Sequence, residues 1–297
     1  MSPDASPPHG APVPPPDATA QRSGHAATRH AVARDAASPP DAARPGTAPV
    51  AIRPAATVLV VRDSAAGELE VCLLRRNLES TFVGGVSVFP GGAVEPADGD
   101  PAVLALCDGR TDAEASARLG IDHGGLAYWV AAIRETFEEA GLLPATWAHS
   151  GAPLHFSDDA FAARFAEHRA AVDREERSLA QVLETEGLRL DLTAMHYVSH
   201  WITPPGRSRR YDTRFFLAQA PAGQQLLHDG REAIEGAWMR PVDAIARQEA
   251  GELVMRPPTV WSLHQLARST TAAEALAEAA ALQDVPSFGA NDPRDTA

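Results

Sequence analysis

Three glutamates lie close together in residues 131–142, a short segment with the sequence AAIRETFEEAGL. With about 100° of rotation per residue, an α-helix here would place Glu135, Glu138 and Glu139 on one side. Ile133 and other apolar residues would form a buried stripe on the opposite side. Like charges at this spacing repel one another, so the cluster has an energetic cost. Clustered carboxylates are also the ligands that hard divalent cations such as Mg²⁺ require.

A plain acidic surface is the alternative interpretation of this cluster, and for three isolated glutamates it is the commoner outcome. The surrounding sequence favours chemistry instead. The segment FPGG at residues 89–92 follows an expected strand and breaks regular structure. Arg134 is the cation close to the glutamates, and it could pair with Glu138 across one helical turn.

Residues 134–142 (RETFEEAGL) resemble the second half of the Nudix box, whose pattern is R-E-U-x-E-E-x-G-U. Residues 92–98 (GAVEPAD) approximate its first half, G-x5-E. The chain departs from the pattern in two ways. Asp98 stands where the box has a glutamate, and residues 99–133 separate the two halves, where the family usually has seven residues.

A subgroup of the Nudix family, the peroxisomal acyl-coenzyme A diphosphatases, interrupts its box at this same place. The likeness extends to residues 73–92, to HWITPPGRSRRYDTRFF at residues 200–216 and to RPPTVWSLHQL at residues 256–266. It covers about residues 56–268, and the sequence is identified as a member of the Nudix hydrolase superfamily.

The resemblance implies an α/β fold, an α/β/α sandwich around a mixed β-sheet. A helical insertion would interrupt the box, and extra helices would follow at the C-terminal end. Glu135, Glu138 and Glu139 would bind Mg²⁺ or Mn²⁺ with the backbone carbonyl near Gly91. The catalytic residues would be Glu138, Glu139, Arg134 and Glu232. Arg134 would orient the glutamates, and Glu139 or Glu232 would be the general base.

Substrate-binding candidates come from two basic segments. Arg76 and Gly85 fit a coenzyme A signature of some Nudix enzymes, but Thr81 stands where its second arginine belongs. Arg209, Arg210 and Arg214 surround Tyr211. Their guanidinium groups could bind phosphate oxygens in pairs, and Tyr211 or Trp201 could stack on adenine. We expect Arg76, Arg210, Arg214 and Tyr211 to bind the substrate.

The function expected from the resemblance is metal-dependent hydrolysis of a diphosphate bond in a small nucleotide-type substrate. Coenzyme A or acyl-coenzyme A is the leading substrate, with 3′,5′-ADP and (acyl-)phosphopantetheine as products. One alternative is a pyrophosphatase acting on ADP-ribose, dinucleotides or NDP-sugars. Another is a non-catalytic Nudix module that senses a nucleotide, which the replacement of glutamate by Asp98 leaves open.

The elements that must position these residues alternate between strands and helices. Residues 55–62 and 69–75 predict a strand hairpin, residues 86–89 a third strand, and residues 125–140 a helix with Gly141 as its C-cap. The other expected elements are a helix-like segment at 101–119, one or two helices over 161–184, strands at 195–202, 211–217 and 237–240, and helices at 242–249, 259–268 and 272–282.

We expect three parts of the chain: a disordered Pro/Ala-rich tail at residues 1–53, a Nudix domain at 54–283 with an insertion at 99–124, and a disordered tail at 284–297.

The net charge of −13 argues against a nucleic-acid polymer or an anionic membrane as the partner. Two cysteines cannot make a disulfide framework. Without a long apolar run or a signal segment, we expect a cytoplasmic protein. The insertion could be a lid or the surface of a homodimer.

Overall fold

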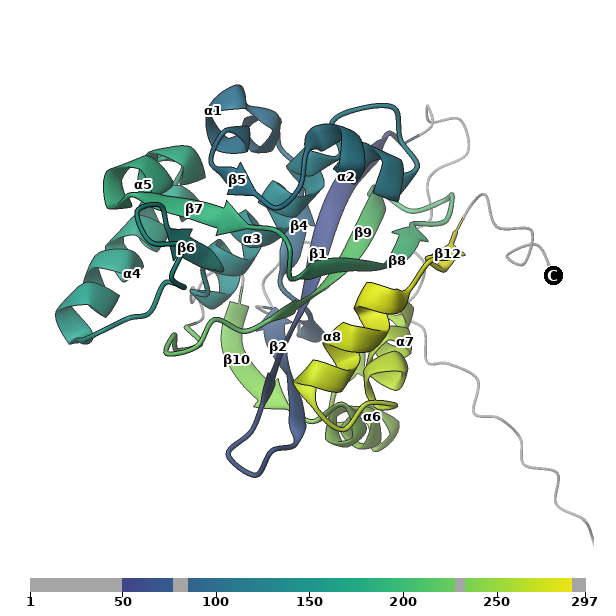
Figure 1. Cartoon of the computed structure of the whole chain (residues 1–297). Coiled ribbons are helices and arrows are strands. Elements are labelled where there is room, and N and C mark those ends of the chain that lie inside the picture. The colour runs from purple at the N-terminus through teal and green to yellow at the C-terminus, as the bar shows by residue number, and fades with distance from the viewer. Residues whose placement is uncertain (1–49, 77–84, 228–232, 290–297) are drawn as a thin grey trace, which may run out of the picture. The chain divides into compact units, whose positions relative to one another are not determined.

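The computed structural model describes residues 50–76, 85–227 and 233–289, which belong to one compact unit, Asp41–Ala297. Figure 1 shows their helices and strands. The helical elements are η1 (Pro96–Gly99), α1 (Pro101–Leu104), α2 (Asp112–Leu119), α3 (Leu126–Ala140), α4 (Asp159–Asp173), α5 (Leu179–Glu186), α6 (Pro241–Glu249), α7 (Pro257–Leu266) and α8 (Ala272–Ala281). The strands are β1 (Ile52–Asp63), β2 (Leu69–Arg76), β3 (Val86–Val88), β4 (Gly91–Ala93), β5 (Cys107–Asp108), β6 (Ala145–Trp147), β7 (Leu188–Asp191), β8 (Met195–Ile202), β9 (Arg210–Gln219), β10 (Ala233–Met239), β11 (Val254–Met255) and β12 (Ser287–Phe288).

The described strands form a nine-stranded mixed sheet in the order β11-β3-β2-β1-β9-β8-β12, with β10 beside β2 and β4 beside β1. Strand β1 is central, antiparallel to β2 and parallel to β9. Residues 55–61 (AATVLVV) are almost all buried, as expected for a strand that is covered on both faces. The predicted α/β fold around a mixed sheet is therefore confirmed.

Helices cover both faces of this sheet. On one face α3 packs through its apolar side, where the indole of Trp129 lies 4.7 Å from the ring of Phe216. On the other face α7 and α8 contribute Leu263 and Ala275 to a second apolar cluster. Alternate residues of β1 supply the two clusters, because successive side chains of a strand point to opposite faces; Val58 belongs to the first and Leu59 to the second.

Several expected elements are confirmed. The β1–β2 hairpin and the β8–β9 pair are both antiparallel. Helix α3 ends as predicted at Gly141, which adopts φ +70° and donates to the carbonyls of Phe137 and Thr136. Residues 161–184 fall on two helices, α4 and α5. The segment Pro90-Gly91-Gly92 was expected to end regular structure, but Gly91–Ala93 forms β4 against β1.

The insertion differs from the expected helix-like segment at residues 101–119. It forms two short helices, α1 and α2, with β5 between them. Strand β5 pairs in parallel with β7, and β6 completes a small second sheet in the order β5-β7-β6. Helix α2 starts with a capping box in which Thr111 and Glu114 bond each other's backbone amides. The second sheet was missed because its strands are very short and distant in sequence.

Both predicted domain boundaries need correction within the described residues. Strand β1 starts at Ile52, inside the segment expected to be a disordered tail, and residues 1–49 lie outside the described part. At the other end β12 pairs in parallel with β8. There Phe288 stacks on Trp201 at 4.1 Å and contacts the edge of Trp261 at 5.0 Å. This packing is long-range, so composition alone could not predict it.

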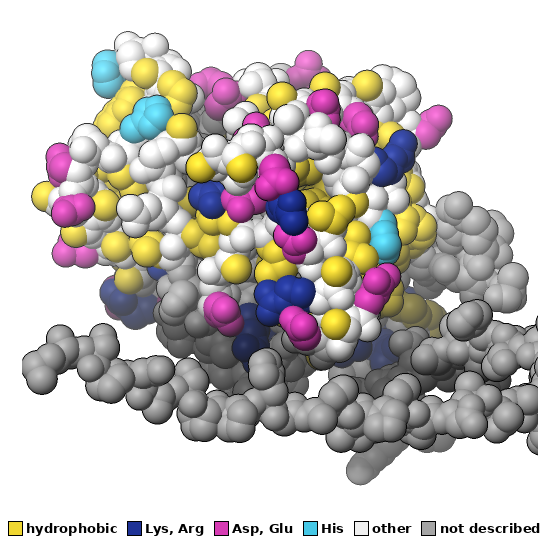
Figure 2. Space-filling model, turned by 90° about the horizontal axis from the view of Figure 1, so that it is seen from below, with side chains coloured by type: hydrophobic (Ala, Val, Ile, Leu, Met, Phe, Trp, Pro, Cys, Tyr) yellow, Lys and Arg dark blue, Asp and Glu magenta, His cyan; other side chains and the backbone are white. Residues whose placement is uncertain are grey.

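Charged side chains of both signs are scattered over the face shown in Figure 2, where basic groups do not gather into one patch. In the part of the chain that the structure describes, every helix is too short or too polar to cross a lipid bilayer.

The contact between β12 and the two tryptophans can be tested by replacing Phe288 with alanine. Because Phe288 is only partly buried, we expect the free energy of unfolding to fall by about 2 kcal/mol. Urea denaturation measures this change, and Asp284→Ala in the same segment is the control. Equal stability of Phe288→Ala and the wild type would contradict the observed packing.

Candidate active site

The three glutamates of α3 face a cleft. The side chains of Glu135 and Glu138 are only 13% and 16% exposed, and Glu139 is buried. A solvent-facing acidic stripe would be far more exposed, so the plain-surface alternative is wrong for these residues. The opposite side of α3, including Ile133 and Phe137, is packed into the core. Both sides of the helix therefore contact protein, and its carboxylates are held close to the sheet.

A buried arginine connects the carboxylates. Arg134 donates from Nε and Nη2 to the two carboxylate oxygens of Asp98, at 2.8 and 3.1 Å. Its Nη2 also donates to the backbone carbonyl of Ala93 at 2.9 Å. Its Nη1 donates to Glu135 at 3.0 Å and to Glu138 at 3.2 Å. One guanidinium thus orients three carboxylates from two segments of the chain.

Asp98 fills the position at which the Nudix box has a glutamate. The residue is 1% exposed and lies on η1, where it also accepts a hydrogen bond from the backbone amide of Glu95 at 2.8 Å. The shorter side chain still makes a two-pronged ion pair with Arg134. Although Asp98 departs from the box pattern, it therefore still supplies a carboxylate that positions Arg134. The sequence had not indicated this role for Asp98.

The glycines of β4 bring the backbone close to the glutamates. The backbone amide of Gly91 donates to Oε2 of Glu139 at 2.9 Å. A Cβ atom at Gly92 would collide with the carboxylate of Glu135, and one at Gly91 would collide with Ala56 and Thr57 of β1. Gly91 therefore needs to be glycine, and a side chain at Gly92 would displace the carboxylate of Glu135. The predicted role of a carbonyl near Gly91 in metal binding stays a prediction.

Burial also changes the protonation of the cluster. It raises the pKa of Glu135 to about 7, against the lowering effect of the Arg134 charge. Burial likewise raises the pKa of Glu138 to about 7, again opposed by Arg134. For Arg134 burial acts to lower the pKa, but its bonds and ion pairs with the carboxylates outweigh burial and raise the pKa. The cluster therefore attracts positive charge, as a proton or as a metal ion.

The residues present fit a divalent cation by their chemistry. Among the described residues, no three metal-ligating side chains already converge on one point. The reason is that Arg134 holds Glu135 and Glu138, while the Gly91 amide holds Glu139. The donors are nevertheless carboxylate oxygens that lie close together in a cleft, as Mg²⁺ and Mn²⁺ prefer. A bound cation would compete with Arg134 for two of the carboxylates.

The cleft beside the cluster has a volume of about 750 Å³. Its walls come from β1 and β4, from α3, from the start of the insertion and from the α4–α5 connection. Arg177 and Ser178 belong to that connection, which sequence reasoning had not placed at the site. Arg169 of α4 joins this wall to α3, because its Nε donates to the backbone carbonyl of Glu138 at 2.8 Å.

The predicted substrate-binding residues separate into two groups. Arg76 and Tyr211 line the cleft, as does Arg209, the third arginine beside Tyr211. Arg210 and Arg214 do not line it. Successive residues of β9 alternate between faces, so these two point away from the face of Tyr211.

Contacts confirm where Arg210 and Arg214 lie. Arg210 donates from Nε to the carbonyl of Thr203 at 3.0 Å. Arg214 is 6% exposed, and its Nη1 donates to the hydroxyl of Tyr197 at 3.0 Å. Its Nε lies 3.4 Å from Oδ1 of Asp212. The three arginines that were expected to bind phosphates around Tyr211 are therefore divided: Arg209 lines the cleft, whereas Arg210 and Arg214 do not. Glu232 and Thr81 lie outside the described residues.

The raised pKa values predict how pH affects the metal-free protein. A carboxyl whose folded pKa is about 7, against an ordinary value of 4.5, penalises the folded state once it ionises. Its contribution to stability is complete below about pH 4.5 and is lost as pH rises through about 7. We expect Mg²⁺ to raise Tm more at pH 8 than at pH 5.5, measured by differential scanning fluorimetry. An equal gain at both pH values would contradict this.

The ion pair between Asp98 and Arg134 gives a second prediction. Asp98→Asn leaves a buried guanidinium without its two-pronged partner, and we expect the free energy of unfolding to fall by about 3 kcal/mol. Asp98→Glu restores the charge and should lose less. Urea denaturation of the metal-free variants measures both changes. Wild-type stability of Asp98→Asn would show that the pair does not hold the site together.

Comparisons with known proteins agree with this geometry. Residues 111–266 match the family described as the NUDT19 Nudix domain. The chain is 31% identical over 236 residues to the acyl-coenzyme A diphosphatase NUDT19 of Gallus gallus, covering 67% of this chain and 61% of that protein. It is 27% identical over 245 residues to the Homo sapiens protein of the same name, covering 72% and 65%. The chain thus spans less than two thirds of the length of these curated relatives.

Among solved structures, a NUDIX hydrolase from Alicyclobacillus acidocaldarius is similar, with a TM-score of 0.64 and 28% identity. The likeness covers 77% of this chain and 97% of the other. The family match includes α3 with its three glutamates and more than half of the 297 residues. The chain therefore belongs to the NUDT19 Nudix domain family.

Proposed function

We propose that this protein hydrolyses the diphosphate bond of coenzyme A or acyl-coenzyme A in the presence of Mg²⁺ or Mn²⁺. The products would be 3′,5′-ADP and phosphopantetheine or its acyl derivative. The observation that carries the proposal is the cluster of carboxylates on α3, which Arg134 and Asp98 hold against a cleft of about 750 Å³. The similar proteins from Gallus gallus and Homo sapiens are named acyl-coenzyme A diphosphatases, which supports this substrate.

Each residue of the cluster has a proposed part. Glu135, Glu138 and Glu139 would hold the cation. A bound divalent cation neutralises diphosphate charge and lowers the pKa of an attacking water. Arg134 is a positioning residue, since its contacts aim two of the carboxylates. Glu139 remains the general-base candidate within the described residues, because its carboxylate lines the cleft beside Glu138. Glu232 stays an alternative base.

Three cleft residues could bind the substrate's nucleotide. Arg76 and Arg209 supply guanidinium groups that match phosphate oxygens in pairs. Tyr211, on the same face of the sheet, offers an aromatic ring on which adenine could stack. This set replaces the clamp expected from the sequence, in which Arg210 and Arg214 took part.

Two other functions use the same residues. A pyrophosphatase acting on ADP-ribose, dinucleotides or NDP-sugars would need the same carboxylates and differ in the products. A non-catalytic nucleotide sensor would not need a costly cluster of buried acids. The raised pKa values of Glu135 and Glu138 therefore argue against the sensor.

Product analysis tests the proposal. Purified protein with millimolar Mg²⁺ or Mn²⁺ is given coenzyme A, acetyl-coenzyme A, ADP-ribose and NADH in separate reactions. We expect 3′,5′-ADP from the first two, and at least about 100-fold slower turnover by Glu138→Gln. Glu184→Gln, an exposed acid of α5, is the matched control. Preferred turnover of ADP-ribose or NADH would refute the substrate, and binding without any turnover would refute the enzyme.

A further inference from the structure

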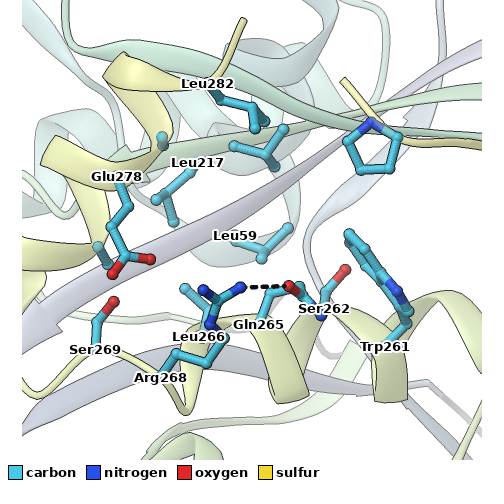
Figure 3. A pocket seen from close by; sticks show the side chains of 14 residues that line it. Leu59, Leu217, Trp261, Ser262, Gln265, Leu266, Arg268, Ser269, Glu278 and Leu282 are labelled. Carbon is cyan, nitrogen blue, oxygen red and sulfur yellow. Dashed lines mark hydrogen bonds between the residues drawn. The ribbon is translucent and has the colours of Figure 1, made fainter. Parts of the chain in front are cut away.

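A second hollow lies between the sheet and the two C-terminal helices α7 and α8 (Figure 3). Its volume is about 170 Å³. Most of its walls are apolar, and they include Leu59, Leu217, Trp261, Leu266, Ala275 and Leu282. A cavity of about 150 Å³ with such walls accepts a benzene-sized molecule, so this one has room for an apolar group of about six carbons.

One polar atom in this wall lacks a partner. Ser262 of α7 is 1% exposed, and among the described residues its Oγ has no hydrogen-bond partner. Figure 3 shows the hydroxyl directed into the hollow beside Trp261. A buried hydroxyl without a partner is unfavourable, and nearly all such groups in folded proteins are satisfied. A ligand with a carbonyl oxygen next to an apolar chain would accept this hydrogen bond and fill the space.

The hollow and the cleft lie along the same face of the sheet. On β1, Ala55 and Thr57 line the cleft and Leu59 lines the hollow. These residues are two positions apart along the strand, so their side chains share a face, and Thr57 and Leu59 are about 7 Å apart. On β9, Thr213 lines the cleft and Leu217 the hollow in the same way.

Two tryptophans also connect the hollow with the cleft. Trp261 lines the hollow and contacts Trp201 with ring centroids 5.9 Å apart. Trp201 in turn pairs with Thr213, a residue of the cleft. Phe215 lies on β9 between the cleft and the hollow and is 6% exposed. On β9, one residue of this face, the buried Phe215, therefore separates the cleft from the hollow.

We propose that this hollow binds the acyl group of an acyl-coenzyme A whose diphosphate lies in the cleft, and that Ser262 Oγ donates to the carbonyl oxygen of the thioester. The proposal rests on the function proposed above. It assigns a preference for acyl chains of about six carbons, since longer chains exceed the volume. It also makes Ser262 a specificity-determining residue for the acylated substrate.

The test compares KM for coenzyme A, hexanoyl-coenzyme A and palmitoyl-coenzyme A. In the wild type we expect KM for the hexanoyl substrate to be roughly tenfold below that for coenzyme A, with no further gain for the palmitoyl chain. Ala275→Leu fills the hollow and should abolish the difference while KM for coenzyme A stays within about twofold. Ala277→Leu makes the same change at an exposed position of α8 and should behave as the wild type.

Ser262→Ala gives a second measurement that does not depend on filling the cavity. Removing an unpartnered hydroxyl should leave Tm unchanged or higher. The same change should raise KM for hexanoyl-coenzyme A about fivefold and leave KM for coenzyme A unchanged. A lower Tm with unchanged KM values would mean that the serine is merely structural, which overturns its assigned role.

Failure of this inference can be told apart from failure of the proposed function. Turnover of coenzyme A with equal KM values for all chain lengths, or a hexanoyl preference that survives Ala275→Leu, would overturn the acyl site alone. If neither substrate is hydrolysed, the proposed function fails, and the acyl assignment fails with it. Ligand-observed NMR of hexanamide binding then still tests whether the hollow accepts an acyl group. We expect binding to the wild type and to Ala277→Leu but not to Ala275→Leu.

Discussion

The site depends on one buried guanidinium. Arg134 is 7% exposed and contacts Asp98, Ala93, Glu135 and Glu138. Burying an arginine is unfavourable unless its donors are satisfied, and here the partners come from both sides of the long insertion. The contact joins η1 and β4 to α3 and lowers the repulsion among the glutamates of one helix. Without it, Glu135 and Glu138 would lose the cation that both of them contact.

This interaction also explains how the chain accommodates its insertion. Asp98 and Arg134 are far apart in sequence, yet their side chains form a two-pronged ion pair. The intervening residues form α1, β5 and α2, and β5 joins a small sheet of its own instead of the main one. The geometry of the box is therefore set by the ion pair and by the close approach of Gly91 and Gly92, and not by the length of the connection.

Much of this arrangement could be predicted from local sequence. The helical period of residues 131–142 placed the three glutamates together, and the apolar runs predicted β1, β2, β8 and β9. The separation of Arg210 and Arg214 from the cleft also has a local signal, because alternation along β9 puts them on the face opposite Tyr211. That signal is local, and it separates residues that look like one basic cluster in the sequence.

Other features arise from contacts between distant segments. The α4–α5 wall of the cleft, the small second sheet and the packing of Phe288 between two tryptophans each join residues that are far apart in the chain. No periodicity encodes such contacts. The role of Asp98 is of the same kind, because the sequence shows only a departure from a pattern, whereas its burial and its two bonds to Arg134 show what the carboxylate does.

The central claim is that Arg134 and Asp98 hold the α3 glutamates as a binding site for a divalent cation. Titration with Mn²⁺, followed by electron paramagnetic resonance, tests it most directly and needs no substrate. The account predicts that the wild type binds Mn²⁺ in competition with Mg²⁺ and that Glu135→Gln weakens binding about tenfold or more. Asp98→Asn should also weaken it, although Asp98 is not a proposed ligand. Mn²⁺ affinity that is the same in all three proteins would contradict the account.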